Sequence, residues 1–158
     1  MRQIETSLDI AAPADKVWDV LADLRGWDEW NPVITRMRAT LSPRTPVSFV
    51  IAAGGREMKI RAEMIKVEFG RELRWRGPTN GALGLMLRGE HYLVVESAGP
   101  ARSRIVHGEQ FEGLLLPVIW GKLRSDLEEA YSEMNRALKA RVERKSAPPS
   151  SGAARKSS

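Results

Sequence analysis

A long helical repeat of apolar residues dominates the C-terminal part of the sequence. From about residue 116 to residue 142 the apolar positions recur every three or four residues, which is the period of an amphipathic helix. At ~1.5 Å per residue such a helix is about 40 Å long. It needs an equally long apolar surface to lie on, because an amphipathic helix is stabilised mainly by the face it buries. The stripe consists of Leu116, Trp120, Leu123, Leu127, Ala130, Met134 and Leu138.

The segments before this helix alternate apolar and polar side chains, the pattern of half-buried β-strands. Turn residues such as Gly54-Gly55 and Gly99-Pro100 separate them, and strands joined by short turns run antiparallel. After Met64 the apolar parity shifts to Ile65, which predicts a bulge that bends the strand. The alternating segments are residues 3–10, 37–41, 47–51, 58–69, 73–76, 90–96 and 104–112.

Two short helices are expected after the first strand. Pro13 suits the first turn of one helix, which Gly26 would end. A further short turn at residues 27–30 stops before Asn31-Pro32. We therefore predict an α+β fold, in which a curved antiparallel sheet of six to seven strands wraps around the long C-terminal helix.

Composition excludes several classes of site. The chain has 158 residues, which suits one domain. The absence of cysteine rules out disulfides and thiolate metal sites, and two histidines are too few for a histidine-rich zinc site. No metal or cofactor is expected. The longest apolar run is far below the ~20 residues that span a bilayer, and no signal peptide is evident, so a cytoplasmic protein is predicted.

The positive charge lies at the C-terminal end. The chain has 25 Lys and Arg against 20 Asp and Glu, yet seven of the basic residues and only one acidic residue follow residue 135. We expect a domain at residues 1–145 and a disordered basic tail, rich in Ser, Pro and Ala, at residues 146–158. Any membrane contact through this tail is expected to be weak. The tryptophans do not interleave with basic residues, so specific nucleic-acid binding is not expected.

A sheet that bends around a long helix leaves room between the two, and that room is a natural ligand cavity. The side chains expected to face inward are mostly apolar, and methionine suits an adaptable wall. The alternative is that they simply fill a core. The predicted ligand-binding residues are Met37, Phe49, Met58, Ile60, Met64, Trp75, His91, Leu93, His107, Glu109, Trp120, Leu123 and Leu127.

Three polar side chains share this inward face. If a hairpin turns at Gly99-Pro100, His91 lies opposite Glu109 and His107 lies opposite Leu93, with Cβ atoms ~4.5–5.5 Å apart. Buried ionisable groups are rare unless they are paired. His91, His107 and Glu109 are therefore candidates for binding a polar ligand group, for moving a proton, or for a purely structural pair.

Four stretches resemble the SRPBCC superfamily, the helix-grip fold of START lipid-transfer domains, birch-pollen-type allergens and bacterial polyketide cyclases. They are APADKVWDVL at residues 12–21, WDEWNP at 27–32, GEHYLVVE at 89–96 and IVHGEQFEGLLLP at 105–117. The resemblance covers about residues 2–143. The sequence is similar to the branch of small bacterial proteins labelled polyketide cyclase/dehydrase, and this similarity implies a cavity for a hydrophobic ligand.

Three functions follow as hypotheses. The first is binding of a hydrophobic or aromatic small molecule, lipid-like or polyketide-like, by a monomer or homodimer. The second is a cyclase or dehydratase that uses His91, His107 or Glu109 as acid and base. The third is a protein-interaction module that uses the basic C-terminal end.

Overall fold

The computed structural model describes residues 1–147. The predicted α+β fold is confirmed, with all seven strands preceding the long helix. The elements are β1 (Arg2–Ile10), α1 (Ala14–Ala22), the 3-10 helix η1 (Leu24–Glu29), β2 (Ile34–Arg38), β3 (Thr45–Ala53), β4 (Arg56–Glu68), β5 (Glu72–Gly77), α2 (Gly81–Met86), β6 (Arg88–Ser97), β7 (Ser103–Glu112) and α3 (Leu116–Ser146).

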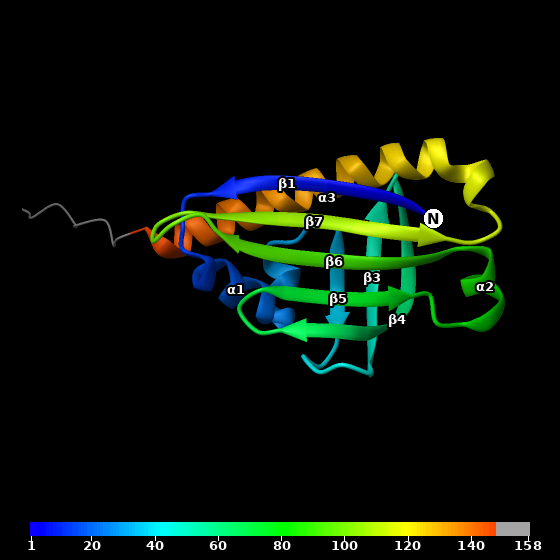
Figure 1. Ribbon diagram of the computed structural model, residues 1–158, viewed down its shortest axis with the longest axis horizontal. Coiled ribbons are helices and arrows are strands. Elements are labelled where there is room, and N and C mark those ends of the chain that lie inside the picture. Colours follow the sequence, from blue (N-terminus) through cyan, green and yellow to red (C-terminus); the bar gives the residue numbers. More distant parts are fainter. Residues whose placement is uncertain (148–158) are drawn as a thin grey trace, which may run out of the picture.

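The strands form one antiparallel sheet in the order β1-β7-β6-β5-β4-β3-β2. Each strand from β2 to β7 pairs with its neighbour in sequence, and β1 closes the sheet against β7. Figure 1 shows β2, β3 and the first half of β4 crossing the direction of β5, β6, β7 and β1. This turn in strand direction gives the sheet its concave face.

A bulge in β4 produces the bend. The pairing of β4 with β5 shifts register between Met64 and Lys66, which confirms the bulge predicted from the change in apolar parity. An extra residue on one strand increases the local twist and turns the strand. The first half of β4 can therefore follow β3 while the second half follows β5.

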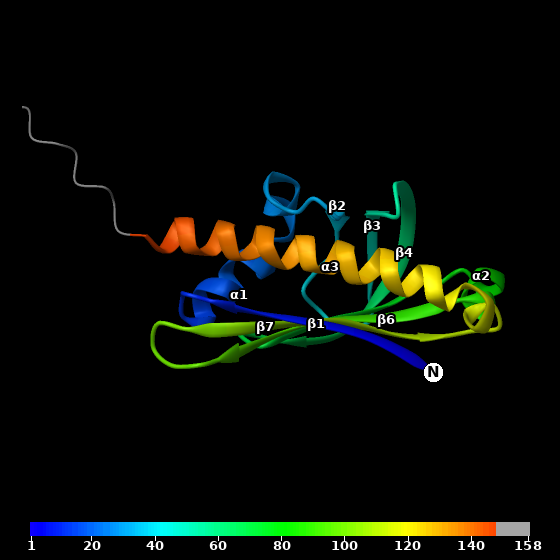
Figure 2. The ribbon, with the colours of Figure 1, turned by 90° about the horizontal axis from the view of Figure 1, so that it is seen from above.

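Helix α3 lies along the concave face of the sheet (Figure 2), and it extends further than the sequence suggests. It begins at Leu116, as predicted, but continues to Ser146, beyond the expected end at residue 142. The side chains of Met134 and Leu138 are fully buried and belong to the same core as Ile4, Leu93 and other residues of the sheet.

Three local expectations are wrong. Residues 77–84, whose three glycines predict a loop, include the start of the short helix α2. The segment after β7 holds this helix in place, since the Leu115 N–H donates to the Met86 carbonyl at 3.0 Å. Gly26 does not end a helix but lies inside η1, where its N–H donates to Asp23. Strand β2 ends at Arg38, so residues 39–41 are not part of it.

No helix among residues 1–147 is long and apolar enough to cross a membrane. Apart from its first two residues, the predicted tail lies outside the described part of the chain. The boundary between domain and tail therefore stays a proposal.

Candidate functional site

The candidate site is a row of side chains that crosses four strands on the concave face. The predicted pairing of β6 with β7 is confirmed, because His91 is opposite Glu109 and Leu93 is opposite His107. Strand β5 places Trp75 beside His91. Strand β1 places Thr6 beside His107. Antiparallel pairing thus gathers residues that are far apart in sequence into one cluster.

The two imidazoles contact each other and are closed off from solvent. His91 is 3% exposed and His107 is 0% exposed. Their Nε2 atoms are 3.0 Å apart. His91 Nδ1 lies 3.4 Å from Glu109 Oε2, and His107 Nδ1 lies 2.9 Å from Asn135 Oδ1. Glu109, Asn135 and the two histidines therefore form one continuous polar chain inside an apolar core.

Helix α3 supplies two members of this chain that the sequence analysis did not single out. The Tyr131 hydroxyl donates to Glu109 Oε2, and the Tyr131 ring stacks on His107 with ring centroids 4.2 Å apart. Asn135 donates through Nδ2 to Thr6 Oγ1 at 2.9 Å. The two residues are four apart and so share a helix face. The sequence signal that could have revealed Tyr131 and Asn135 is a pair of polar residues, four apart, beside the apolar stripe of the helix.

The polar chain fixes where its protons reside. Because Asn135 donates through Nδ2, its Oδ1 accepts from His107 Nδ1–H. The free Nε2 of His107 then accepts from His91 Nε2–H. His91 Nδ1 then lies opposite Glu109 Oε2, and these two atoms are the remaining donor–acceptor pair of the polar chain. Their 3.4 Å separation exceeds an ordinary N–H···O bond, so proton transfer requires the two groups to approach.

Burial controls the charge of two groups. It lowers the pKa of His107 well below 6.5, the neighbouring His91 lowers that pKa further, and the hydrogen bond to Asn135 opposes the shift. Burial also raises the pKa of the Tyr131 phenol well above 10, as does the Glu109 carboxylate. At neutral pH, therefore, His107 is uncharged and Tyr131 keeps its proton as a donor.

Gly89 makes room for the outer end of the chain. Gly89 lies two residues before His91 on β6, on the same face of the strand, and a methyl group there would lie 1.8 Å from Glu109 Oε1. The Glu109 side chain is 15% exposed, so it is the most accessible member of the row formed with His91 and His107. The carboxylate thus links the buried imidazoles to the edge of the core.

Aromatic side chains occupy the space beside the imidazoles. Trp75 stacks on His91 with ring centroids 4.3 Å apart, and Phe49 and Trp27 contact Trp75 edge-on at 6.0 and 6.3 Å. The expectation that the imidazoles line an open hollow is therefore wrong for this structure. They point inward, as predicted, but Trp75 and Tyr131 cover them.

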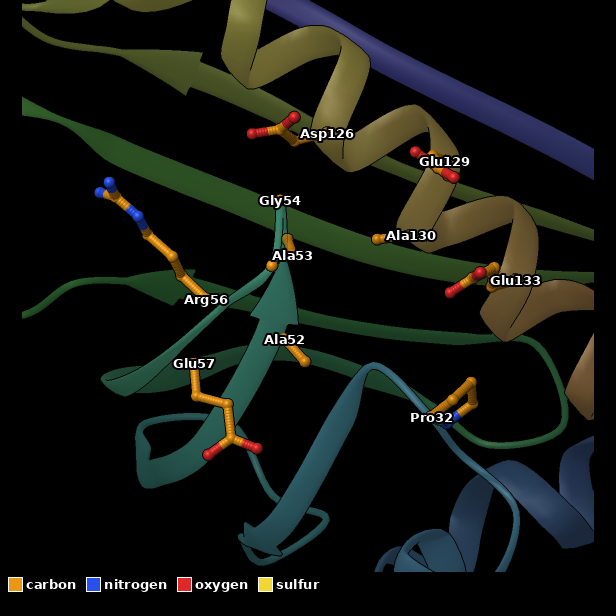
Figure 3. Close-up of a pocket in the computed structure, with 11 residues that line it drawn as sticks. Pro32, Ala52, Ala53, Gly54, Arg56, Glu57, Asp126, Glu129, Ala130 and Glu133 are labelled. Carbon is orange, nitrogen blue, oxygen red and sulfur yellow. The ribbon is translucent and has the colours of Figure 1, made fainter.

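A pocket of about 460 Å³ does lie between the sheet and α3, at the tip of the β3–β4 hairpin. Figure 3 shows the hairpin tip facing a row of carboxylates on the helix. Gly54 approaches the helix so closely that a methyl group there would be 2.3 Å from Asp126. The pocket is lined by Pro32, Ala52, Ala53, Gly54, Gly55, Arg56, Glu57, Asp126, Glu129, Ala130 and Glu133. None of the predicted ligand-binding residues belongs to this lining.

The predicted apolar ligand-binding residues instead fall into four groups. Met64, Trp75 and Leu93 are fully or almost fully buried in the core, with Phe49 and Leu127 nearly so. Ile60, Trp120 and Leu123 are half-buried against it. Met37 lines a second pocket. Met58 was expected to face inward but is 50% exposed, because β4 extends past the core near the hairpin tip.

Within residues 1–147, no three His, Asp or Glu side chains converge as a metal site would require. The chemistry that the residues themselves offer is hydrogen bonding and proton transfer along the Glu109–His91–His107 row.

Sequence comparison identifies one matching family. A profile of the family described as polyketide cyclase/dehydrase and lipid transport matches residues 1–143. Among proteins with curated descriptions, none is significantly similar to the chain.

Solved structures share the fold at low sequence identity. Zhui aromatase/cyclase from Streptomyces sp. R1128 is 18% identical, with a TM-score of 0.75 over 91% of this chain and 94% of that one. A norcoclaurine synthase mutant from Thalictrum flavum is 14% identical, with a TM-score of 0.72 over 92% and 96%. A START superfamily protein from Mycobacterium smegmatis is 16% identical, with a TM-score of 0.70 over 90% and 97%.

Proposed function

Because the chain belongs to the polyketide cyclase/dehydrase and lipid transport family, we propose that it binds an apolar or aromatic small molecule, lipid-like or polyketide-like, between the sheet and α3. The Glu109–His91–His107 row meets the polar end of that molecule. The observation that carries the proposal is the buried polar chain itself, which joins three strands and α3 at the centre of an otherwise apolar interior.

Folding stability alone does not explain why the core contains this row of polar side chains. Taking ionisable groups out of water carries a desolvation cost, and well-packed apolar side chains of similar volume often stabilise a core equally well. The row therefore makes more physical sense as a feature retained for recognition. A ligand hydroxyl or carbonyl can exchange hydrogen bonds with Glu109 and the imidazoles without leaving any of them unpaired.

The pocket at the hairpin tip provides an entry route for a ligand to the imidazoles. Ala130 lines it, and the next residue, Tyr131, covers His107. Displacement of Tyr131 and Trp75 would open a path from the pocket to the imidazoles. The four acidic side chains of the lining outnumber its one arginine, so the rim repels anions and favours neutral ligands.

Binding can be tested with two neutral aromatic probes, N-phenyl-1-naphthylamine and the hydroxyanthraquinone alizarin at a pH that keeps it uncharged. Either probe should quench tryptophan fluorescence and raise the melting temperature, because a ligand that binds only the native state stabilises it. Filling the pocket with Ala53→Phe should weaken binding about tenfold or more. The matched Ala101→Phe change, in the exposed β6–β7 turn, should not.

Two results would count against the proposal. One is the absence of quenching and of any thermal shift with both probes and with a wider set of sterols and aromatic polyketides. The other is equal weakening by Ala53→Phe and Ala101→Phe, which would place the probe elsewhere.

Acid–base catalysis is a second candidate, and the proton arrangement favours it. His91 Nδ1 faces Glu109 Oε2, and a proton can pass between these two atoms while every other hydrogen bond of the row stays in place. Such a pair can remove a proton next to a ligand carbonyl and return it, which is the elementary step of aldol cyclisation and of dehydration.

Proton exchange measures this step directly. In D2O, the α-protons of bound 2-acetylnaphthalene should exchange faster with the protein than without it. Glu109→Gln and His91→Gln should each abolish the acceleration while fluorescence still reports binding. Unchanged exchange in both variants would assign the row to binding alone.

A further inference from the structure

The exposed apolar side chains of the protein gather at one place. Eight large apolar side chains are exposed within residues 1–147, and five of them belong to α2 and to the segment that leads from β7 into α3. Figures 1 and 2 both show α2 beside that segment, at the end of the molecule far from the C-terminal end of α3. We call this surface the apolar tip, and it consists of Leu83, Leu85, Leu114, Leu115 and Val118.

The two segments of the apolar tip contain no charge. Residues 77–87 and 113–121 have no Asp, Glu, Lys or Arg, although such residues make up 28% of the chain. Single exposed apolar side chains are common on protein surfaces, but a cluster of them is typical of an interaction surface. Five such side chains on two adjoining, uncharged segments therefore call for a partner that is itself apolar.

The backbone at the apolar tip already has hydrogen-bond partners inside the protein. The N–H groups of Leu114 and Leu115 donate to carbonyls at the end of α2 at 3.3 and 3.0 Å. The Val118 N–H donates to the Leu115 carbonyl at 3.0 Å, and Pro117 has no N–H to satisfy. Unpaired backbone groups are what make entry into lipid costly, so this part of the chain can leave water without leaving those N–H groups unpaired.

The charges nearest to the apolar tip are mostly positive. Arg88 follows α2, and Lys122 and Arg124 are the first charged residues of α3. The Arg2 guanidinium lies over the ring of Trp120 in α3, 5.3 Å from its centroid. Glu112 adjoins the tip as an acid, 3.7 Å from Arg88, and carboxylates further along α3 pair with its two cations. The rim therefore favours an anionic partner.

These features fit a lipid surface better than a second copy of the chain. Two copies that met at their apolar tips would bring their cationic rims together, at a cost in like-charge repulsion. Stable protein interfaces also use roughly 20–30 residues on each side, far more than the five of the tip. A bilayer with anionic headgroups matches both the apolar centre and the positive rim.

We infer that the apolar tip docks into the surface of a bilayer that contains anionic lipid. Leu85, Leu114 and Val118 enter the boundary between headgroups and acyl chains, while Arg2 and Lys122 lie among the headgroups. This contact is distinct from the weak one expected of the basic tail. It rests on the exposed surface alone and does not depend on the ligand site proposed between the sheet and α3.

Insertion can be measured with a single fluorescent label, because the chain has no cysteine. Leu114→Cys and Phe69→Cys each carry one environment-sensitive NBD group. Phe69 is the matched control, since it is also exposed but lies in the turn between β4 and β5, at the end of β5 away from α2 (Figure 1). Vesicles of phosphatidylcholine and phosphatidylglycerol should brighten the label at position 114 and shift its emission to the blue. The label at position 69 should not respond.

Substitutions separate the apolar contribution from the electrostatic one. Leu85→Ser and Leu114→Ser should each weaken cosedimentation with the mixed vesicles about tenfold or more, because each removes an apolar side chain that leaves water on docking. Phe69→Ser should not. Lys122→Gln should weaken it about fivefold, and vesicles of phosphatidylcholine alone should bind less protein. The melting temperatures of the Leu85 and Leu114 variants should stay within about 2 °C of the parent, because these side chains are exposed.

Three results would overturn the inference. One is an equal response of the two labels, or none from either, when mixed vesicles are added. Another is an effect of Phe69→Ser on cosedimentation as large as that of Leu85→Ser. The third is a dimer in sedimentation equilibrium that Leu114→Ser dissociates, without vesicle binding, which would assign the apolar tip to a second copy of the chain.

Discussion

At the scale of single residues, His107 is the side chain whose surroundings say most about the site. It has no exposed surface, its Nδ1–H donates to Asn135, and its Nε2 accepts from His91. A second proton on this ring would be placed in the core beside His91. The folded protein therefore keeps His107 neutral over a range of pH in which an exposed histidine is charged.

The stability of the protein should consequently fall in mild acid. Since the pKa of His107 is lowered well below 6.5, the unfolded chain takes up a proton below that pH while the folded chain does not. The contribution of His107 to the free energy of unfolding is therefore complete above pH 6.5. Below that pH the free energy of unfolding decreases by up to about 1.4 kcal/mol per pH unit, until the pH reaches the pKa of His107 in the folded protein. Urea unfolding between pH 7.5 and 5.5, above the range of ordinary carboxylates, measures this slope. His107→Gln should flatten it, and an equally steep slope in that variant would assign the acid sensitivity to other groups.

Asn135 should matter for stability because it is the acceptor for a buried N–H. Asn135→Ala leaves His107 Nδ1–H without a partner and should lower the free energy of unfolding by about 1–3 kcal/mol. Glu133→Ala, two residues away and exposed, should change it by less than about 0.5 kcal/mol. Equal effects in urea unfolding would mean that the hydrogen bond contributes nothing.

The sequence predicts part of this cluster and misses part of it, for a physical reason. The turn at Gly99-Pro100 determines which residues of β6 and β7 are opposite each other, so the pairing of His91 with Glu109 follows from counting along two strands. The contribution of Tyr131 and Asn135 depends on how α3 is rotated against the sheet. That rotation comes from packing of the whole helix face, which no local pattern specifies.

At the scale of secondary structure, the apolar period of α3 proved sufficient to predict the helix-on-sheet arrangement. Leu127, Met134 and Leu138 are buried, as the stripe predicts. The N-terminal end of the stripe is different, because Trp120 and Leu123 are only half-buried. Periodicity identifies the face of a helix but cannot say how far along the helix the sheet continues.

Two substitutions in α3 test this difference along the helix. Leu138 has no exposed surface, whereas Val118 is 85% exposed. Leu138→Ala should lower the free energy of unfolding by about 2–5 kcal/mol through lost burial and a cavity. Val118→Ala should change it by less than about 0.5 kcal/mol. Similar losses of unfolding free energy in the two variants, measured by chemical denaturation, would contradict the observed packing of α3 on the sheet.

Helix α2 shows where local patterns fail. Its glycines argue for a loop, and the six-residue helix forms nevertheless, because its end is hydrogen-bonded to the segment that leads into α3. Tertiary contacts of this kind override weak local preferences. The bulge in β4 is the opposite case, since a change in apolar parity reports directly on which face of a strand is buried.

At the scale of the whole molecule, the two pockets carry charges of opposite sign. The pocket at the hairpin tip carries four acidic side chains against one arginine, and the second pocket, beside η1, carries three arginines without an acid. The sequence analysis assigned the basicity to the C-terminal end alone. It could not reveal this separation within the near-neutral body, because the charges that converge come from four different elements.

The proposed domain boundary can be tested by truncation. Leu138 and Val142 are buried, and Glu143 accepts from the Ala11 N–H at 2.8 Å, so α3 is anchored well before Ala147. A chain that ends at Ala147 should melt within about 2 °C of the full chain. A chain that ends at residue 137 should melt far lower. A large loss on removing residues 148–158 alone would place part of that segment in the folded domain.

The most direct test of the proposed function is ¹⁵N NMR of the two imidazoles as N-phenyl-1-naphthylamine or alizarin is added. In the free protein, His107 should be neutral with its proton on Nδ1. Saturation with a probe should shift the ¹⁵N resonances of the ring nitrogens of both His91 and His107. Saturable binding that leaves all four ring nitrogens unchanged would contradict a ligand site at this row.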